Sequence, residues 1–400
     1  DPVSLCVLHV VLFLEWRNFF VTTENKKDTT GAAAGAAKNG GRTPNQKKGT
    51  RGPRGPQKGR EGNKPAAAAS AALAQPAARK APAPAQTGGK AAATGTQQKK
   101  TTRSNRGRPK KTAVTPVKLT PLGGLNEIGK NITLFEYGDD AFLIDCGMAF
   151  PDDDMLGVDI VLPDFTYVEK NKDRIKGIVL THGHEDHIGG LPYLLKQMNF
   201  PLYGSRLTLA LVESKLKEHG LAGKVAMNVV EAGSVVKFGA VSVEFISVNH
   251  SIPDAMALGI KTPIGYVVHT GDFKIDCTPI QGRMIDLCRF GELGKQGVLA
   301  LLADSTNAER PGYTPSERVV GESFANLFKK AEHKRIIIAT FSSNLHRIQQ
   351  IIEAAIKDGR KVAVSGRSMV NVVTKAIELG YLNVPKDVLV DIDNIGRYPS

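Results

Sequence analysis

Large apolar side chains are distributed very unevenly along this chain. Residues 25–118 consist mostly of Ala, Gly, Pro, Lys, Arg, Gln and Thr, and apolar side chains larger than Ala are nearly absent from them. Such a segment has too little apolar surface to offset the entropy that is lost on ordering. The pattern therefore predicts a disordered tail over residues 25–118, followed by a folded region.

Residues 1–24 have a different pattern, because residues 3–14 are mostly apolar and are interrupted by His9. This run is too short to cross a bilayer as a helix. It also lacks a basic leader and an obvious small-residue cleavage site, so we do not predict a signal peptide or any membrane association. The segment is left unassigned.

Short strand-like runs and turns alternate over residues 119–310. The runs are rich in β-branched and aromatic side chains, and Gly220 ends a longer amphipathic stretch. The pattern predicts helices over residues 191–198 and 207–219, and strands over residues 131–137, 141–145, 175–180, 225–231, 235–238, 241–248, 266–270 and 298–303.

The pattern changes at residue 311. The sequence Thr-Pro-Ser-Glu at residues 314–317 is typical of a capping box with Pro at the first helical position, and it predicts a helix to about Lys330. Strand and helix periods then alternate over residues 335–340, 345–357, 361–365 and 368–379. This alternation predicts a Rossmann-like unit with parallel strands and crossover helices.

One stretch, Thr-His-Gly-His-Glu-Asp-His-Ile-Gly-Gly, gathers three histidines and two carboxylates between a predicted strand and a predicted helix. His182 and His184 are two apart on a turn and can face one metal ion, while Asp186 and His187 can face a second ion beside it. Gly183 is expected to let the backbone turn tightly between them. The alternative is a histidine-rich surface loop that binds metal adventitiously.

Several separate motifs resemble those of one known family. The His-rich stretch resembles the signature of the metallo-β-lactamase superfamily. Four further stretches resemble motifs of the ribonuclease J family, which belongs to the β-CASP branch of that superfamily. They are LGGLNEIG (residues 122–129), LIDCGM (143–148), FPDDD (150–154) and HTGD (269–272). The resemblance implies an α/β fold: an incomplete metallo-β-lactamase αββα sandwich over residues 119–310, and the truncated start of an inserted Rossmann-like β-CASP domain over residues 311–400.

The resemblance also assigns site residues outside the His-rich stretch. His250 is implied as the third ligand of the first metal, the alternative being a satisfied core histidine. Asp272 is implied as the carboxylate that bridges both metals, so that a shared hydroxide can attack phosphorus. Asp304 is implied to orient a leaving-group histidine, the alternative being an Asp that closes a strand. Relatives supply that histidine and the last ligand of the second metal from a His-Ala-Ser-Gly-His type segment, which this sequence does not contain.

Further cofactor and ligand sites follow from the same resemblance. The two divalent ions are expected to be zinc, with manganese or magnesium as alternatives. The carbonyl of Gly157 and the carboxylate of Asp159 are candidates for a structural calcium, against the alternative of a solvated acidic loop. Ser342, Ser343 and Asn344 lie between a strand and a helix and are candidates for binding an RNA phosphate. The alternative for these three residues is an ordinary helix N-cap.

Charge and cysteine content bear on partners and location. The net charge is +14 for the whole chain, but residues 25–118 carry +20 and the remainder −6. Such a basic segment can bind RNA through its phosphates, although it can also be a solvated spacer. The four cysteines form no CxxC pair, which fits a reducing cytoplasm. Cys146, beside the site, is interpreted as a small buried residue.

The expected function is that of a two-metal ribonuclease with 5′-to-3′ exonuclease and endonuclease activity in RNA maturation and decay. Two alternatives remain: a lactamase-fold hydrolase of a small thioester or lactam, and an RNA-binding protein whose incomplete second metal site does no catalysis. Partners implied by the family are RNA, a homodimer or homotetramer, and other RNA-decay enzymes.

Overall fold

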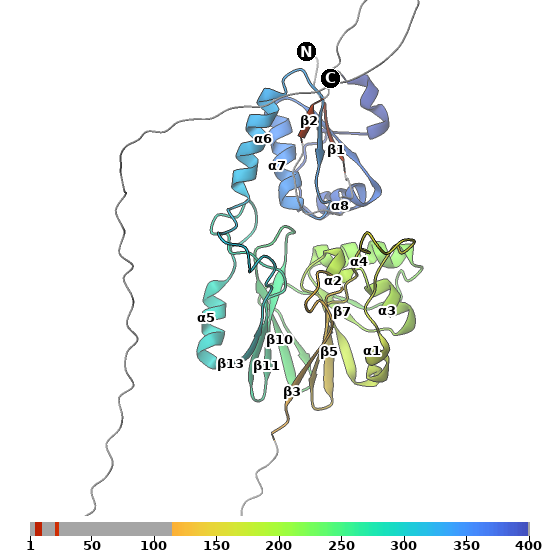
Figure 1. Ribbon diagram of the computed structural model, residues 1–400, viewed down its shortest axis with the longest axis vertical. Helices are drawn as coiled ribbons and strands as arrows, with labels where there is room; N and C mark the ends of the chain where they lie inside the picture. Colours follow the sequence, from red (N-terminus) through yellow and green to blue (C-terminus); the bar gives the residue numbers. More distant parts are fainter. Residues whose placement is uncertain (1–4, 10–20, 24–113, 399–400) are drawn as a thin grey trace, which may run out of the picture. The chain divides into compact units, whose positions relative to one another are not determined.

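The computed structural model describes residues 5–9, 21–23 and 114–398. The predicted disordered tail lies almost entirely outside these residues. Among the helices of the described part, none is both long enough and apolar enough to cross a bilayer. The described residues form three sheets with flanking helices, as shown in Figure 1.

The first sheet has the strand order β3-β4-β5-β6-β7-β8. Pairing is antiparallel from β3 to β5 and parallel from β5 to β8. Its strands are β3 (Val117–Gly123), β4 (Ile132–Tyr137), β5 (Asp140–Ile144), β6 (Ile175–Val179), β7 (Leu202–Gly204) and β8 (Met227–Val229).

The second sheet has the strand order β13-β12-β11-β10-β9. Its neighbours are antiparallel, except that β12 and β13 are parallel. Its strands are β9 (Val235–Phe238), β10 (Val241–Ser247), β11 (Met256–Thr262), β12 (Gly265–His269) and β13 (Val298–Leu302).

Aromatic and aliphatic side chains fill the space between these two sheets. Phe135 and Phe142 stack with ring centroids 4.9 Å apart, and Phe142 stacks on Phe238 at 4.8 Å. Val243 and Leu258 of the second sheet belong to the same buried cluster. The sheets therefore pack face to face, as the strand alternation requires.

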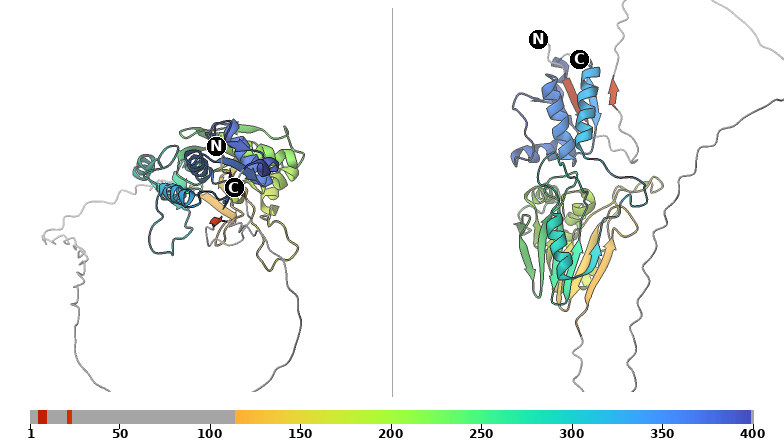
Figure 2. Two further views of the ribbon diagram at one scale, coloured as in Figure 1. Left: turned by 90° about the horizontal axis from the view of Figure 1, so that it is seen from above. Right: turned by 90° about the vertical axis from the view of Figure 1, so that its left-hand side faces the viewer.

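Helices cover the outer faces of the two sheets, which completes an αββα sandwich (Figures 1 and 2). The apolar faces of α3 and α4 are buried beside the first sheet, and Leu293 of α5 is buried against the second. These elements are α1 (Thr166–Lys170), η1 (Lys172–Arg174), α2 (Glu185–Ile188), α3 (Leu191–Gln197), α4 (Arg206–Glu218) and α5 (Leu287–Gln296). The predicted metallo-β-lactamase sandwich is confirmed, although its strands β3, β7 and β11 and its helices α1, α2 and α5 were not predicted.

The third sheet, with the order β16-β15-β1-β14-β2, forms the predicted Rossmann-like unit. Strands β14, β1, β15 and β16 run parallel, and β2 is antiparallel to β14. The elements are β1 (Leu5–His9), β2 (Val21–Thr23), α6 (Arg318–Lys330), β14 (Ile336–Ala339), α7 (Leu345–Lys357), β15 (Lys361–Ser365), α8 (Arg367–Glu378), β16 (Leu389–Val390) and η2 (Ile392–Arg397).

Two strands from the unassigned first 24 residues join this third sheet. β1 lies between β14 and β15 and pairs with both, and β2 occupies an edge of the sheet. A short apolar run is compatible with a buried parallel strand, but sequence pattern alone did not assign it.

The predicted capping box before α6 is wrong. The helix begins at Arg318, and its N-cap residue Glu317 makes no side-chain cap hydrogen bond. The Glu317 carboxylate pairs instead with Arg347 at 2.7 Å, and the Ser316 hydroxyl donates to Asp276 at 3.0 Å. A partner far along the chain therefore takes the Glu317 carboxylate, which a capping box would use.

Candidate metal centre

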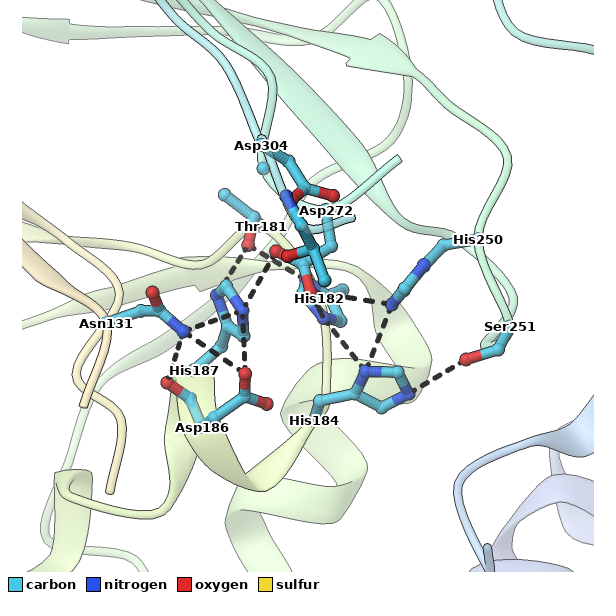
Figure 3. Close-up of polar contacts among 12 residues, drawn as sticks. Asn131, Thr181, His182, His184, Asp186, His187, His250, Ser251, Asp272 and Asp304 are labelled. Atoms are coloured by element: carbon cyan, nitrogen blue, oxygen red, sulfur yellow. Dashed lines mark hydrogen bonds and ion pairs between the residues drawn. The ribbon is translucent and has the colours of Figure 1, made fainter. Parts of the chain in front are cut away.

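The candidate site lies where strands of the two sandwich sheets end. Thr181 follows β6, His250 follows β10, and Asp272 follows β12. β10 and β12 each run antiparallel to β11, so their carboxyl ends lie at the same end of the second sheet. Figure 3 shows the side chains from these three strand ends turned toward one another.

The His-rich stretch differs in one respect from the loop that was predicted. Residues Glu185–Ile188 form the short helix α2, and His184 is its N-cap residue in an extended conformation. Asp186 and His187 therefore lie on a helical turn, whereas His182 and His184 lie on the extended segment before it. The change of backbone conformation separates the stretch into two halves that face different parts of the site.

Three histidines form the first group of the site together with Asp272. The Nε2 atoms of His182 and His250 each lie 3.1 Å from Nδ1 of His184. One ligand atom from each histidine and one Asp272 oxygen fit within 4.8 Å of one another. Three imidazole nitrogens and one carboxylate oxygen at this separation are a donor set that suits zinc.

Asp186, His187 and Asp272 form the second group. Nε2 of His187 lies 3.4 Å from Oδ2 of Asp186 and 3.2 Å from Oδ1 of Asp272. The other oxygen of Asp272, Oδ2, faces the first group, at 3.9 Å from His182 and 3.8 Å from His250. Asp272 thus turns one carboxylate oxygen toward each group, as a bridging ligand would.

Burial keeps the histidines of the first group neutral. It lowers the pKa of His184 to about 3 and that of His250 to about 4, and it places the pKa of His182 well below the ordinary value. Neighbouring imidazoles act in the same direction. At neutral pH each ring therefore keeps one N–H and one nitrogen lone pair, which is the form that coordinates a metal.

His187 behaves in the opposite way. Burial by itself lowers its pKa, but the nearby carboxylates of Asp186, Asp145 and Asp272 outweigh burial and place the pKa well above the ordinary value. The charged His187 in turn helps to hold the pKa values of Asp186 and Asp272 below the usual range, against the effect of their burial. Three carboxylates around one imidazole form an anionic pocket that favours a cation.

Sequence reasoning missed the role of Asp145, which is almost completely buried behind the site. Its Oδ2 accepts hydrogen bonds from Nδ1 of His187 and from the Thr181 hydroxyl, both at 2.8 Å, and its Oδ1 accepts from the Thr181 amide. Thr181 in turn contacts Nδ1 of His182 at 3.0 Å. These bonds hold Nε2 of both histidines toward the centre, as outer-shell carboxylates do at metal sites.

Asn131 was also missed. Its side-chain amide donates to the Asp186 carbonyl at 3.0 Å and to the Asp186 carboxylate at 3.2 Å, and it lies 3.1 Å from Nε2 of His187. Gly147 lies beneath this contact, and a Cβ atom there would approach the Asp186 carbonyl to 1.6 Å. Asn131 lies just after the motif LGGLNEIG, and Gly147 lies within the motif LIDCGM, so both motifs contribute to the backbone that supports α2.

The expected reason for Gly183 is incorrect. Its φ is not positive, so the turn does not require glycine. A Cβ atom at this position would instead lie 2.9 Å from Cδ1 of Leu211 in α4 and 3.4 Å from Cδ1 of Ile252. The need for glycine arises from close packing beneath the first two histidines.

Asp304 lies after β13, near Asp272 in the view of Figure 3. Its Oδ1 accepts a hydrogen bond from the Thr306 amide at 2.9 Å, and its own amide donates to the Thr270 hydroxyl at 3.0 Å. These bonds are also those of an Asp that closes a strand. The orienting role of Asp304 therefore stays a prediction.

Other predicted residues lie outside the centre. Within the described residues, the acidic loop around Asp159 does not bring three metal-ligating side chains together, and Gly157, with φ of +79°, is exposed. The structural-calcium assignment stays a prediction. Cys146 is fully buried, and burial raises the pKa of its thiol, which agrees with its interpretation as a packed residue.

The candidate phosphate-binding turn lies between β14 and α7. Asn344 is the N-cap residue of α7, and its side chain accepts from the Arg347 amide at 3.1 Å. The Ser342 hydroxyl lies 2.9 Å from that of Ser368, at the start of α8. The turns before α7 and α8 therefore meet, which places two helix N-termini side by side.

Comparison with known proteins agrees with this geometry. The model of the metallo-β-lactamase superfamily matches residues 125–286, and the model of the ribonuclease J β-CASP domain matches residues 333–400. A crystal structure of a protein of unknown function from Enterococcus faecalis shares the fold, with a TM-score of 0.51, 18% identity, and coverage of 71% of this chain and 75% of that chain.

Curated relatives are much closer in sequence. Ribonuclease J of Synechocystis sp. is 50% identical over 293 residues, which cover 73% of this chain and 46% of the relative. Ribonuclease J 1 of Streptococcus pyogenes is 50% identical over 270 residues, and ribonuclease J2 of Bacillus subtilis is 43% identical over 284. These matches cover 68% and 71% of this chain and 48% and 51% of the two relatives.

The chain therefore spans about half the length of the curated relatives that it matches. The residues that match the metallo-β-lactamase model precede those that match the β-CASP model, which is the expected order. The histidines and carboxylates of the centre lie within residues 125–286, the metallo-β-lactamase match. This chain belongs to the ribonuclease J family, in the β-CASP branch of the metallo-β-lactamase superfamily.

Proposed function

We propose that the protein is a two-metal ribonuclease that hydrolyses RNA phosphodiester bonds. The observation that carries the proposal is the placement of Asp272, whose two carboxylate oxygens face a histidine group on one side and a carboxylate-rich group on the other. Two divalent ions at such a site, with zinc as the expected metal and manganese or magnesium as alternatives, would supply an acidic water and charge stabilisation at phosphorus.

The residues of the chain have separate tasks in this proposal. His182, His184 and His250 present neutral nitrogens because burial disfavours their protonation. Asp145 fixes the orientation of His187 from behind, so that Nε2 stays turned toward Asp186 and Asp272. A centre held on strand ends in this way keeps its geometry while a substrate binds.

Asp304 is proposed to orient a histidine that protonates the leaving group. Its position after β13, with its amide bonded to Thr270 two residues before Asp272, supports this role, although its bond to the Thr306 amide also suits a purely structural one. The domain limits at residues 119–310 and 311–400 remain part of the proposal, as does a calcium ion near Gly157 and Asp159.

RNA is the proposed substrate for two reasons. The turns before α7 and α8, with Ser342 and Ser368 in contact, can cradle a phosphate at two helix N-termini; Ser343 and Asn344 belong to the first turn. The basic residues 25–118 can bind the RNA backbone without sequence preference. From the resemblance to the ribonuclease J family we further propose combined 5′-to-3′ exonuclease and endonuclease action, a cytoplasmic location, self-association, and work alongside other RNA-decay enzymes.

One assay separates this proposal from its two alternatives. The protein is loaded with zinc or manganese, its metal content is measured, and it is incubated with a 5′-monophosphorylated RNA, a thioester and a lactam. We expect two metal ions per chain and cleavage of the RNA alone. Thioester or lactam turnover would identify a small-molecule hydrolase. RNA binding without turnover, at full metal content, would identify a non-catalytic RNA-binding protein.

The role of residues 25–118 is tested by their deletion. We expect the metal content to be unchanged, because the segment contributes no large apolar side chains to a core. RNA binding should weaken, and its dependence on salt concentration should become shallower because fewer phosphates are neutralised. An unchanged salt dependence would show that the segment is a spacer.

A further inference from the structure

The loop that carries His250 is held at both ends by side chains from the β-CASP region, defined here as the residues 333–400 matched by that family model. This loop, from His250 to Asp254, is the middle part of the connection between β10 and β11. Its two ends contact different parts of the β-CASP region, one in the first turn of α7 and one just after α8. Neither contact belongs to the ligand groups of the centre.

At the first end, His346 of α7 makes a hydrogen-bonding contact with the backbone of His250. The ring of His346 is largely enclosed and has Lys274, Glu317 and Asp276 as charged neighbours. Lys274 also pairs by its backbone with Asn249, the residue before His250. The first turn of α7 therefore lies against the backbone segment that aims the third histidine.

At the second end, the hydroxyl of Tyr381 donates to the carboxylate of Asp254. The same hydroxyl accepts a hydrogen bond from the Leu207 amide at the start of α4, so Tyr381 is fixed from two sides. Asp254 has φ of +58°, a conformation that L-residues adopt only when their surroundings stabilise it. Within the described residues, Tyr381 donates the side-chain hydrogen bond that Asp254 receives.

A separate contact joins the same two regions without touching this loop. Ser214 of α4 donates to Asn371 of α8 at 3.4 Å. Loss of that bond should loosen the packing of α4 on α8, while the ends of the His250 loop keep their partners. Ser214 thus offers a matched control for the effect of contacts between the two regions in general.

We propose that His346 and Tyr381 are positioning residues that set the direction of His250. The packing of the β-CASP region against the His250 loop would then control how tightly the first group holds its metal. The inference rests on the ligand assignment in the proposed function. Its physical basis is that groups behind a ligand tune metal affinity by about 10–100-fold when they are removed. A β-CASP region that moves with its substrate would then change metal affinity through the same loop.

The test measures zinc release from the loaded 400-residue chain to a coloured chelator, with no RNA present. Release should occur in two phases, and the slow phase should report the first group. We expect Tyr381→Phe combined with His346→Leu to accelerate the slow phase about 10-fold. Ser214→Ala should leave it unchanged. When His346→Asn is used in place of His346→Leu, most of the acceleration should disappear, because Asn keeps an N–H donor. The visible spectrum of the cobalt-loaded double variant should shift, because its ligand geometry has changed.

Each outcome decides between two assignments. His250→Ala serves as the reference: if it leaves the slow phase intact, the ligand assignment itself is incorrect. If His250→Ala abolishes the slow phase but the double variant releases zinc like the unmodified chain, the positioning role is refuted. An equal effect of Ser214→Ala would likewise refute it. If the double variant does not fold, Tyr381→Phe alone carries the test, because it removes a single oxygen atom.

Discussion

The two halves of the metal centre are built from different chemistry. On one side, His182, His184 and His250 are kept neutral by burial, with pKa values far below the ordinary range. On the other side, carboxylates outweigh burial and raise the pKa of His187. The first half thus offers nitrogen lone pairs in a preformed arrangement, whereas the second half offers negative charge. Burial by itself lowers the pKa of all four histidines, but the net shift of His187 is opposite because its neighbours are carboxylates.

Asp272 connects the two halves, and its replacement should have the largest effect. Asp272→Asn keeps the shape of the side chain but removes the charge that faces both groups. Metal affinity should fall by more than about 100-fold, since even groups behind a ligand contribute 10–100-fold. RNA cleavage should be abolished. Elemental analysis and a cleavage assay on the same preparation check this; full metal content in the variant would contradict the bridging role.

Asp145→Asn should affect the second half more than the first. The buried carboxylate accepts from Nδ1 of His187, and an amide in its place removes charge and can reverse the hydrogen bond. We expect the weaker of the two metal affinities to fall by about 10–100-fold while the stronger one changes less. Titration calorimetry with zinc on both proteins measures the two affinities separately. Equal weakening of both sites would show that Asp145 supports the centre as a whole.

The contrast in pKa values predicts a pH dependence for the metal-free protein. The folded pKa values of His184 and His250, about 3 and about 4, lie below the ordinary value of 6.5. The unfolded chain therefore binds protons first on acidification, and the free energy of unfolding should decrease from about pH 6.5 toward pH 4. His187 acts in the opposite sense: its contribution is present below pH 6.5 and is lost as the pH rises through its raised pKa.

Urea denaturation of the metal-free protein between pH 4 and pH 7 measures this dependence. His250→Gln, which cannot be protonated, should flatten the acid side of the curve. A His333→Gln variant is the matched control, because His333 is exposed and lies outside the centre. Similar flattening in both variants would show that the acid sensitivity does not arise from the buried group.

Asp304→Asn should have the smallest effect on metal binding. Asp304 belongs to neither group of ligands, so metal content should stay the same. If it orients a leaving-group histidine, RNA cleavage by a protein that also carries the His-Ala-Ser-Gly-His type segment should slow by about 10²–10⁴-fold, the range for loss of a general acid. Loss of metal from Asp304→Asn, with metal retained by Asp272→Asn, would require the two assignments to be exchanged.

Much of the architecture could be predicted from local sequence. The helix α7 and the strand β15 have the predicted bounds, since clear periodicity and the glycine at residue 359 define them. Four of the six candidate ligands could be named because they occupy one contiguous stretch, and the other two because their motifs resemble those of the family. The structure brings those six side chains together, while their roles as ligands stay a prediction.

The supporting residues could not be predicted in the same way. Asp145 and Asn131 act on residues 42 and 55 positions away, so no local pattern marks them. Thr314 and Glu317 match the local pattern of a capping box, yet Arg347 pairs with the Glu317 carboxylate. In each case a tertiary contact, which depends on the completed fold, decides what the side chain does.

The most direct test of the difference between the two halves is stepwise removal of metal. The zinc-loaded 400-residue chain is dialysed against a mild chelator, and zinc is determined by elemental analysis at intervals. The histidine group with Asp272 offers four ligands, and the second group offers three in the described residues. We predict that about one ion per chain persists after the other is removed. Loss of both ions at the same rate would contradict the account.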